Sequence, residues 1–194
     1  MLSIIAILVA CNDDIVTNPS LDFPRGTPNA KAFDNLQLVR SLEKKQRQNT
    51  LLIIISTAGA NQEGSVIEGS AWSYFFGVLE NNVERTFIWK VWADGIVEYV
   101  GLAPYHRPYN IIELGPVLKI NSDAAIKIAR HYGAKEYFNK YPNAAITMNY
   151  IWKYSQAIVT VSLYDPYELG ECEPEWLIKS DTGELLHTNV ENCI

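Results

Sequence analysis

The side chains that could carry out chemistry in this sequence are few, and their spacing matches no common catalytic or metal-binding motif. The histidines are His106, His131 and His187, and no two of them have the spacing of zinc ligands. The sequence contains no nucleophile elbow, P-loop, dinucleotide fingerprint or HExxH motif. We therefore expect a protein that is not an enzyme and that uses no metal or cofactor. A hydrolase is the alternative, and it would require the fold to gather the histidines beside an acidic cleft.

Carboxylates form one dense group near the end of the chain. Within eleven residues the sequence places Asp165, Glu168, Glu171, Glu173 and Glu175. Calcium prefers oxygen ligands of this kind, but the spacing of an EF-hand loop is missing. We interpret this stretch as a solvated acidic loop, with a calcium site as the alternative.

The three cysteines indicate export from the cytoplasm. Cys11 follows an apolar run that ends in Leu8-Val9-Ala10, which looks like a bacterial lipobox at the end of a signal peptide. If Cys11 carries lipid, Cys172 and Cys193 are left as an even pair in an oxidising compartment. We predict a disulfide between these two, which bracket a predicted hairpin. Two free thiols are the alternative for this pair, and a buried N-terminal strand is the alternative for the lipobox.

The N-terminal segment therefore predicts where in the cell the protein is located. Residues 1–11 are expected to be the signal peptide that ends at the lipidated cysteine. Residues 12–26 are polar and lack periodicity, which predicts an extended tether. The acidic pair Asp13-Asp14 resembles the surface-export signal of some Gram-negative lipoproteins. We expect an outer-membrane lipoprotein, attached to the membrane through its lipid, that faces the periplasm or the cell surface.

Composition is typical of a globular protein and argues against a nucleic-acid partner. Of the 194 residues, 48% are hydrophobic and 20% are charged, as in ordinary globular domains. A net charge of -6 leaves no basic face that could displace counterions from phosphates. The five Trp and eleven Tyr must lie mostly in the core, and any surplus would form a recognition surface.

The first half of the chain predicts one helix followed by four strands. Thr27-Pro28 is a cap residue followed by proline at the first helical position, and apolar residues from Phe33 to Leu42 recur on one helical face. Asp94-Gly95 is the strongest short hairpin signal in the sequence. The strands are expected at 51–55, 71–79, 87–92 and 96–100.

The second half predicts the same order of elements. Ser122-Asp123 caps a helix over 122–132, and a short second helix is expected at 134–141. Strands follow at 145–152, 157–164, 176–179 and 184–187. We therefore predict an α+β fold of two tandem helix-plus-four-strand units, with the helices packed on one face of an antiparallel sheet and the other face partly open. The units are residues 27–103 and 122–194, joined by a connector at 104–121.

Aromatic residues in the strands raise the question of which sheet face is exposed. Trp89 and Trp92 lie on opposite faces of their strand, so helices on one side cannot cover both. One of them is therefore expected on the open face, where rigid rings would form a binding surface at low entropy cost. Burial under the connector or by stacking between strands is the alternative. The candidate surface residues are Trp72, Tyr74, Trp89, Trp92, Tyr105 and Tyr109.

A family resemblance appears in the second half. The helix opening Ser122-Asp123-Ala124-Ala125-Ile126-Lys127-Ile128-Ala129 and the hairpin from Trp176 to Leu186, with its Thr-Gly-Glu turn, resemble PepSY-type domains. Lys179 occupies a position where PepSY sequences usually carry an Asp. Two such modules in tandem are also similar in layout to the secreted β-lactamase-inhibitory protein. The resemblance implies an exported binding or inhibitory module, without naming a partner.

Our leading hypothesis from the sequence is a non-enzymatic, lipid-anchored envelope protein that binds or inhibits another envelope or secreted protein, with a peptidase as one candidate partner. The second hypothesis is a surface lipoprotein that binds carbohydrate or another small ligand through the same aromatic residues. Neither hypothesis requires a cofactor.

Overall fold

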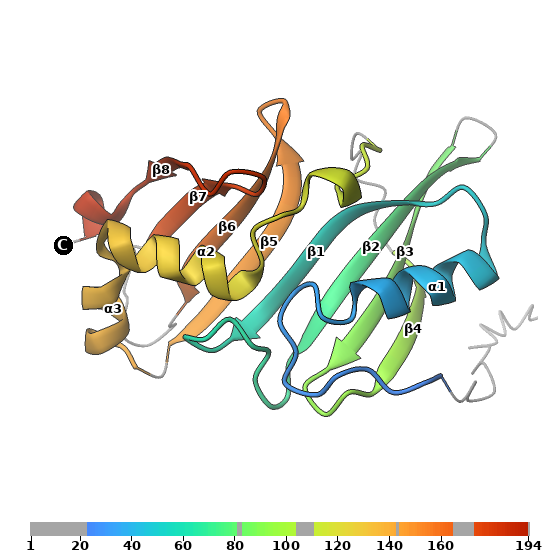
Figure 1. Cartoon of the computed structure of the whole chain (residues 1–194), viewed down its shortest axis with the longest axis horizontal. Coiled ribbons are helices and arrows are strands. Elements are labelled where there is room, and N and C mark those ends of the chain that lie inside the picture. The colour runs from blue at the N-terminus through green and yellow to red at the C-terminus, as the bar shows by residue number, and fades with distance from the viewer. Residues whose placement is uncertain (1–22, 81–82, 104–110, 143, 165–172, 194) are drawn as a thin grey trace, which may run out of the picture.

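The computed structural model describes residues 23–80, 83–103, 111–142, 144–164 and 173–193. Strands in this part of the chain form one continuous antiparallel sheet of eight strands in the order β4-β3-β2-β1-β5-β6-β7-β8 (Figure 1). The first half contributes β1 (Leu51–Ala60), β2 (Ala71–Glu80), β3 (Val83–Trp92) and β4 (Val97–Leu102). The second half contributes β5 (Ala145–Lys153), β6 (Gln156–Tyr164), β7 (Glu175–Lys179) and β8 (Leu185–Thr188). The halves meet where β1 pairs with β5.

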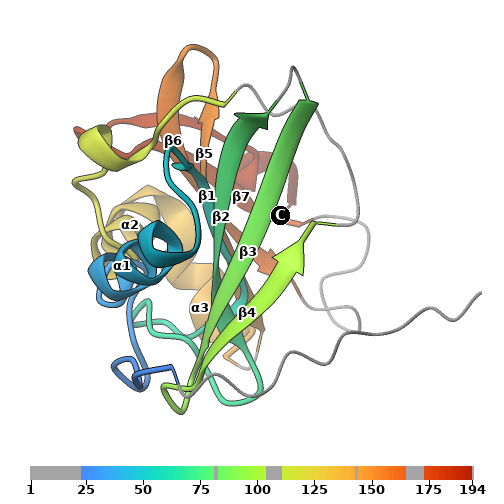
Figure 2. The same ribbon diagram turned by 90° about the vertical axis from the view of Figure 1, so that its right-hand side faces the viewer.

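The main helices lie on one face of this sheet. α1 (Leu36–Gln46) and α2 (Ser122–Ala129) both cover the same side (Figure 2). A wider turn over Arg130–Ala134, with Gly133 at a φ of 97°, leads into α3 (Lys135–Lys140). Single helical turns occur at Gly115–Val117 and Val190–Cys193. No helix in the described part of the chain is long and apolar enough to cross a bilayer.

The predicted combination of helices with an antiparallel sheet is confirmed. Each predicted strand is present, and most extend by a few residues at one or both ends. The two predicted hairpin turns form, one at Asp94-Gly95 and one that ends at Gly183. Gly95 and Gly183 both have a positive φ, which other residues adopt only with strain. The division into units at 27–103, 104–121 and 122–194 stays a prediction.

The predicted start of the first helix was wrong. Thr27-Pro28 does not open α1, which begins only at Leu36. Instead, the Asn35 side chain pairs with the Thr27 backbone through N–H···Oδ1 (2.7 Å) and Nδ2–H···O (3.1 Å) bonds. The carbonyls of Ala30 and Ala32 accept hydrogen bonds from the aromatic side chains of β2. Because these carbonyls are used by the sheet, the segment before Leu36 gains more from irregular turns than from another helical turn.

The start of α2 joins the two halves of the chain. The Ser122 hydroxyl donates to the Gly64 carbonyl (2.6 Å) and accepts from the Ala32 N–H (3.1 Å). Beside it, Lys31 and Asp123 form an ion pair with a 3.0 Å Nζ to Oδ2 distance. These contacts hold the loop after β1 and the segment before α1 against the first turn of α2.

Candidate functional site

The face of the sheet opposite α1 and α2, here called the helix-free face, carries the candidate site. Pairing in register places Ser73, Phe75, Ile88, Lys90 and Trp92 on this face of β2 and β3, because the alternate residues point into the core. Trp89 is fully buried on the helix side, whereas Trp92 is half-buried on the helix-free face. The prediction that one of these two indoles would lie away from the helices is therefore confirmed.

Three residues predicted to be part of the binding surface lie in the core instead. Trp72, Tyr74 and Trp89 have no exposed surface. The Trp72 indole N–H donates to the Ala30 carbonyl (2.9 Å), and the Tyr74 hydroxyl donates to the Ala32 carbonyl (3.0 Å). Burial is tolerated because each polar group has a partner. The sequence held a signal for this outcome, since this face of β2 carries the larger side chains and the opposite face carries Ser73 and Gly77.

Several predicted residues fall outside the described part of the chain. These are Cys11, Tyr105, Tyr109, His106, Cys172 and, from the acidic stretch, Asp165, Glu168 and Glu171. Cys193 is disulfide-bonded, and its pairing with Cys172 stays a prediction. His131 and His187 are both exposed, on the turn after α2 and on β8. Within the described ranges, no group of three or more histidine, cysteine or acidic residues is arranged to hold a metal ion.

Trp92 borders a hollow of about 370 Å³ at the end of β3. We call it the Trp92 hollow. Its lining comes from two segments that are distant in sequence, the loop before β2 and the turn between β3 and β4. The lining residues are Glu68, Gly69, Trp92, Ala93, Asp94 and Ile96. Ligand pockets in proteins start at about 300 Å³, so this hollow suits a small group or a single side chain.

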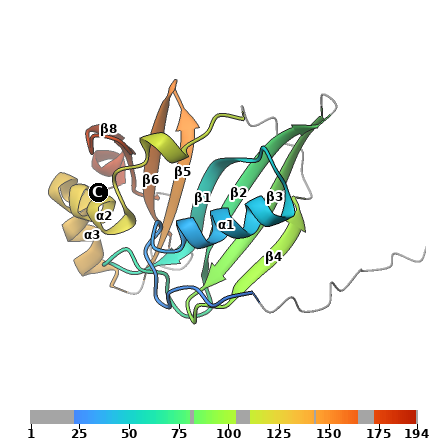
Figure 3. The same cartoon turned by 45° about the vertical axis from the view of Figure 1, so that its right-hand side comes forward.

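The backbone around the Trp92 hollow is held by hydrogen bonds. The Ala93 N–H donates to the Ser70 carbonyl (3.1 Å), which ties the two lining segments together. The chain before α1 runs beside the β3–β4 turn (Figure 3), and the Gly26 N–H donates to the Gly95 carbonyl at 2.9 Å. A Cβ on Gly95 would lie 2.5 Å from the Gly26 carbonyl oxygen, so only glycine permits this approach. The hollow is therefore part of a fixed scaffold.

Charged groups surround the Trp92 indole. Its N–H donates to Glu98 Oε2 (2.8 Å), and Lys90 Nζ lies 5.3 Å from the ring centroid. Asp94 Oδ1 accepts from the Ile96 N–H (2.9 Å), which leaves its second oxygen without a hydrogen bond among the described residues. Glu68 is exposed and has no hydrogen bond or ion pair within the described ranges. Among the described residues, the lining of the hollow thus holds two carboxylates and no cationic side chain.

An apolar row crosses the helix-free face beside this site. The pairing registers align Ile88 with Phe75, Phe75 with Ile54, and Ile54 with Ile151. Ile88, Phe75 and Ile151 are half-buried, and Ile54 is buried. The next row on the same face carries polar side chains such as Ser73 and Lys90. The face therefore presents an apolar strip next to a polar one.

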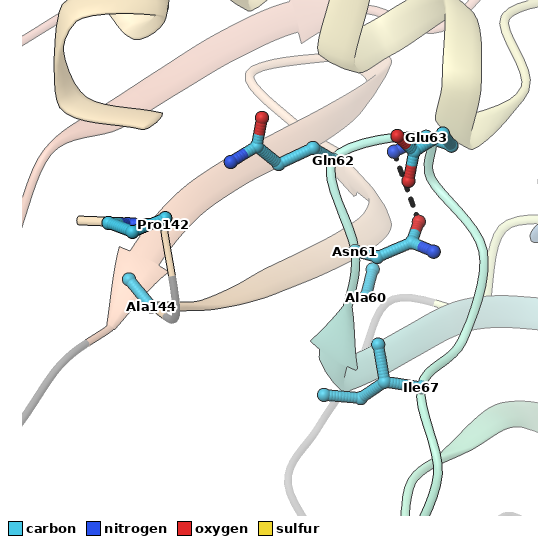
Figure 4. Close-up of a pocket in the computed structure, with 7 residues that line it drawn as sticks. All are labelled: Ala60, Asn61, Gln62, Glu63, Ile67, Pro142 and Ala144. Atoms are coloured by element: carbon cyan, nitrogen blue, oxygen red, sulfur yellow. Dashed lines mark hydrogen bonds between the residues drawn. The ribbon is translucent and has the colours of Figure 1, made fainter. Parts of the chain in front are cut away.

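A second hollow, of about 360 Å³, lies between the loop after β1 and the turn before β5. Figure 4 shows its lining, which consists of Ala60, Asn61, Gln62, Glu63, Ile67, Pro142 and Ala144. Asn61 Oδ1 accepts from the Glu63 N–H (3.0 Å), and Gln62 Oε1 accepts from Arg130 Nη2 (2.8 Å). Its polar groups are thus largely used to hold the loop, and no aromatic side chain of the described residues lines it. The Trp92 hollow is the better candidate for recognition.

No protein family and no curated protein matches this chain. Among solved structures, the chain is similar to a candidate lipoprotein from Clostridium difficile 630, with 9% sequence identity and a TM-score of 0.48. The similarity covers 87% of this chain and 95% of the other chain. At this identity and TM-score, the likeness assigns neither a family nor a function.

Proposed function

We propose that this chain is a non-enzymatic, lipid-anchored envelope protein that binds another protein through the Trp92 end of its helix-free face. The observation that supports this proposal most strongly is the half-buried indole of Trp92 at the rim of a hollow whose backbone is fixed by hydrogen bonds. Partly exposed aromatic residues on rigid scaffolds are typical anchors of protein interfaces, because they bury much area and lose little entropy.

The anchoring part of the proposal is supported by the sequence. The lipobox-like Leu8-Val9-Ala10-Cys11 would attach the chain to the outer membrane, and the tether predicted at residues 12–26 would end before Phe23, whose ring packs on Trp89 (5.1 Å between ring centroids). The assignment of the second half as PepSY-like is supported by the helix opening after Ser122 and by the closing hairpin. That resemblance is the reason for including peptidases among the candidate partners and inhibition among the candidate effects.

The tandem arrangement is part of the same proposal. α1 precedes β1, and α2 and α3 precede β5. These two strands lie side by side in the middle of the sheet, and three further strands follow each of them outward in chain order. This order supports two units of one helix and four strands that share a single sheet. The pairing of the first strands would then be the junction between the units.

Site-specific photocrosslinking tests the binding proposal. A photoreactive phenylalanine analogue would replace Ile96, which lines the Trp92 hollow and is 44% exposed. In cells that express the lipid-anchored chain, irradiation is expected to give a discrete crosslinked species. The same analogue at Tyr154, which is 68% exposed at the β5–β6 turn, is the matched control and is expected to give none.

The Trp92→Ala variant shows whether the indole carries the interaction. We expect this variant to abolish the crosslink at Ile96 while the protein remains folded, because Trp92 lies outside the core. Absence of any crosslink at Ile96, or an equal crosslink in Trp92→Ala, would contradict the proposal.

Carbohydrate binding is a second candidate function. It is favoured by the position of the Glu98 carboxylate, which lies beside the Trp92 indole, since an aromatic face next to hydrogen-bond acceptors suits a sugar. Binding to a glycan array, lost in Trp92→Ala, would support this alternative over a protein partner.

A further inference from the structure

We propose that the Trp92 hollow receives a positively charged side chain, an arginine or lysine from a basic segment of the partner protein. This inference rests on the proposed binding function and adds the chemistry of the ligand. It is carried by three features: the apolar wall of the hollow, the charge of its lining and the net charge of the chain.

The wall of the hollow is apolar and open on one side. Trp92, Ala93 and Ile96 supply the apolar surface, and Gly69 lines the opposite loop. A Cβ placed on Gly69 would meet no atom of the described residues within 4 Å, so these residues leave space beside it. The long methylene stem of an arginine or lysine can cover apolar surface of this kind while its charged end reaches a polar group.

The charge at the hollow is complementary to such an end group. Glu68 and Asp94 line the hollow, and Glu98 binds the indole N–H from beside it. Two cations of the described residues lie beside the hollow but outside its lining, Lys90 at the ring and Arg25 at the Asp94 carbonyl (3.5 Å). A guanidinium or ammonium in the hollow would contact carboxylate oxygens, and tryptophan is the aromatic residue that attracts cations most strongly.

The whole chain favours the same class of ligand. Its net charge of -6 attracts cations and repels anions over about one Debye length. An anionic ligand would have to approach Glu68 and Asp94 without a cation in the lining to neutralise it. A neutral sugar would gain stacking on the indole but nothing from the charge. The hollow in Figure 4 has a similar volume, but its described lining holds one carboxylate and no aromatic ring, which makes it a matched comparison.

Titration with small probes tests this inference directly. The full chain, labelled with ¹⁵N, would be titrated with N-acetyl-arginine amide, with N-acetyl-glutamate amide and with maltotriose while the indole N–H signals are recorded. The Trp92 signal is identified by its loss in Trp92→Phe. We expect the arginine probe to shift this signal. The shift should saturate at probe concentrations of up to roughly 50 mM, because a single charged group binds weakly. The glutamate probe is expected to have no effect.

Variants then show whether the carboxylates of the hollow are responsible. Glu68→Gln with Asp94→Asn is expected to raise the apparent Kd for the arginine probe about three- to tenfold, as for two exposed charge contacts. Asparagine keeps an oxygen for the Ile96 N–H, so the turn is preserved. Glu63→Gln, at the hollow in Figure 4, is the control and is expected to leave the Kd unchanged.

Three outcomes would overturn the inference: no shift of the Trp92 signal by the arginine probe, a shift that the double variant does not weaken, or a shift by maltotriose alone. These outcomes are separable from the failure of the proposed function. A crosslink at Ile96 without arginine binding leaves the function standing and removes the cationic ligand. Arginine binding without a crosslink supports the cationic ligand and contradicts the proposed function.

Discussion

Replacing Glu43 with leucine removes the acceptor of a buried polar cluster between α1 and the sheet. Glu43 is 1% exposed. Its carboxylate accepts from the Trp89 indole N–H (2.7 Å) and from Arg47 Nε (3.0 Å) and Nη2 (3.2 Å). Arg47 Nη2 also donates to the Tyr99 hydroxyl (2.7 Å). In Glu43→Leu the guanidinium of Arg47, whose side chain is only 20% exposed, loses its counterion.

The expected cost follows from what is left unpaired. Breaking a buried ion pair by removing one partner destabilises a protein by about 3 to 5 kcal/mol, since the remaining charge is uncompensated. For a chain of this length that corresponds to a fall in Tm of roughly 6 to 20 °C. Urea unfolding, followed by tryptophan fluorescence and circular dichroism, measures the change in the free energy of unfolding.

The double variant Glu43→Leu with Arg47→Met separates the ion pair from lost packing. Replacing both members of a buried pair with apolar residues is often close to neutral, although the Trp89 N–H stays without an acceptor. We expect the double variant to be more stable than Glu43→Leu alone by at least about 2 kcal/mol. Arg47→Met alone completes the comparison. If the losses of stability in Glu43→Leu and Arg47→Met add up to that of the double variant, or if Glu43→Leu costs less than about 1 kcal/mol, the Arg47 charge is not held by Glu43 as the structure indicates.

Three further predictions concern stability. Tyr150→Phe is expected to leave stability unchanged or to raise it by up to about 1 kcal/mol, because that buried hydroxyl has no partner among the described residues. Tyr74→Phe loses a hydrogen-bonded hydroxyl and is expected to cost about 1 kcal/mol. Equal urea midpoints for the two variants would refute this difference between the two hydroxyls. Gly64→Ala and Gly69→Ala both add a Cβ at positive φ (80° and 75°), but only at Gly64 would it lie 2.5 Å from a backbone nitrogen. We expect Gly64→Ala to be the more destabilising by about 2 kcal/mol or more in thermal unfolding, and equal losses would refute the packing of that loop on α2. Burial acts to raise the pKa of the Asp123 carboxyl, but hydrogen bonds and the charge of the neighbouring lysines lower it overall. Because the folded pKa of Asp123 lies below the unfolded value of about 3.9, its stabilising effect is present above that pH and is lost as pH falls through the folded pKa. The difference in the free energy of unfolding between the native chain and Asp123→Asn should therefore shrink on acidification. A difference that stays constant would contradict the pairing of Asp123 with Lys31.

Much of the fold could be predicted because it depends on local preferences. Alternating apolar residues and turn residues at Asp94-Gly95 and Gly183 predicted all eight strands of the described sheet. The start of α1 was missed because its preceding segment is set by distant groups. Thr27 and Pro28 favour a helix locally, but aromatic side chains some 40 residues later bind the carbonyls of Ala30 and Ala32.

The buried cluster at Glu43 was also missed, although the sequence held a signal for it. Glu43 lies seven residues after Leu36 and four after Val39, so it falls on the buried face of the same helix. A charged residue at such a position indicates a buried partner, and Arg47 follows one turn later. Periodicity alone cannot identify that the third member is Trp89, which comes from another strand.

The sequence by itself determined the elements, their order and the opposite placement of Trp89 and Trp92, because these follow from backbone geometry within a few residues. Only the tertiary structure decided which of the two indoles is buried, that β1 pairs with β5, and that a loop and a turn meet to form the Trp92 hollow. Those outcomes depend on contacts between segments far apart in the chain. The free energies of these contacts depend on which surfaces pack together, and the pattern of residues within a short stretch of sequence does not determine that.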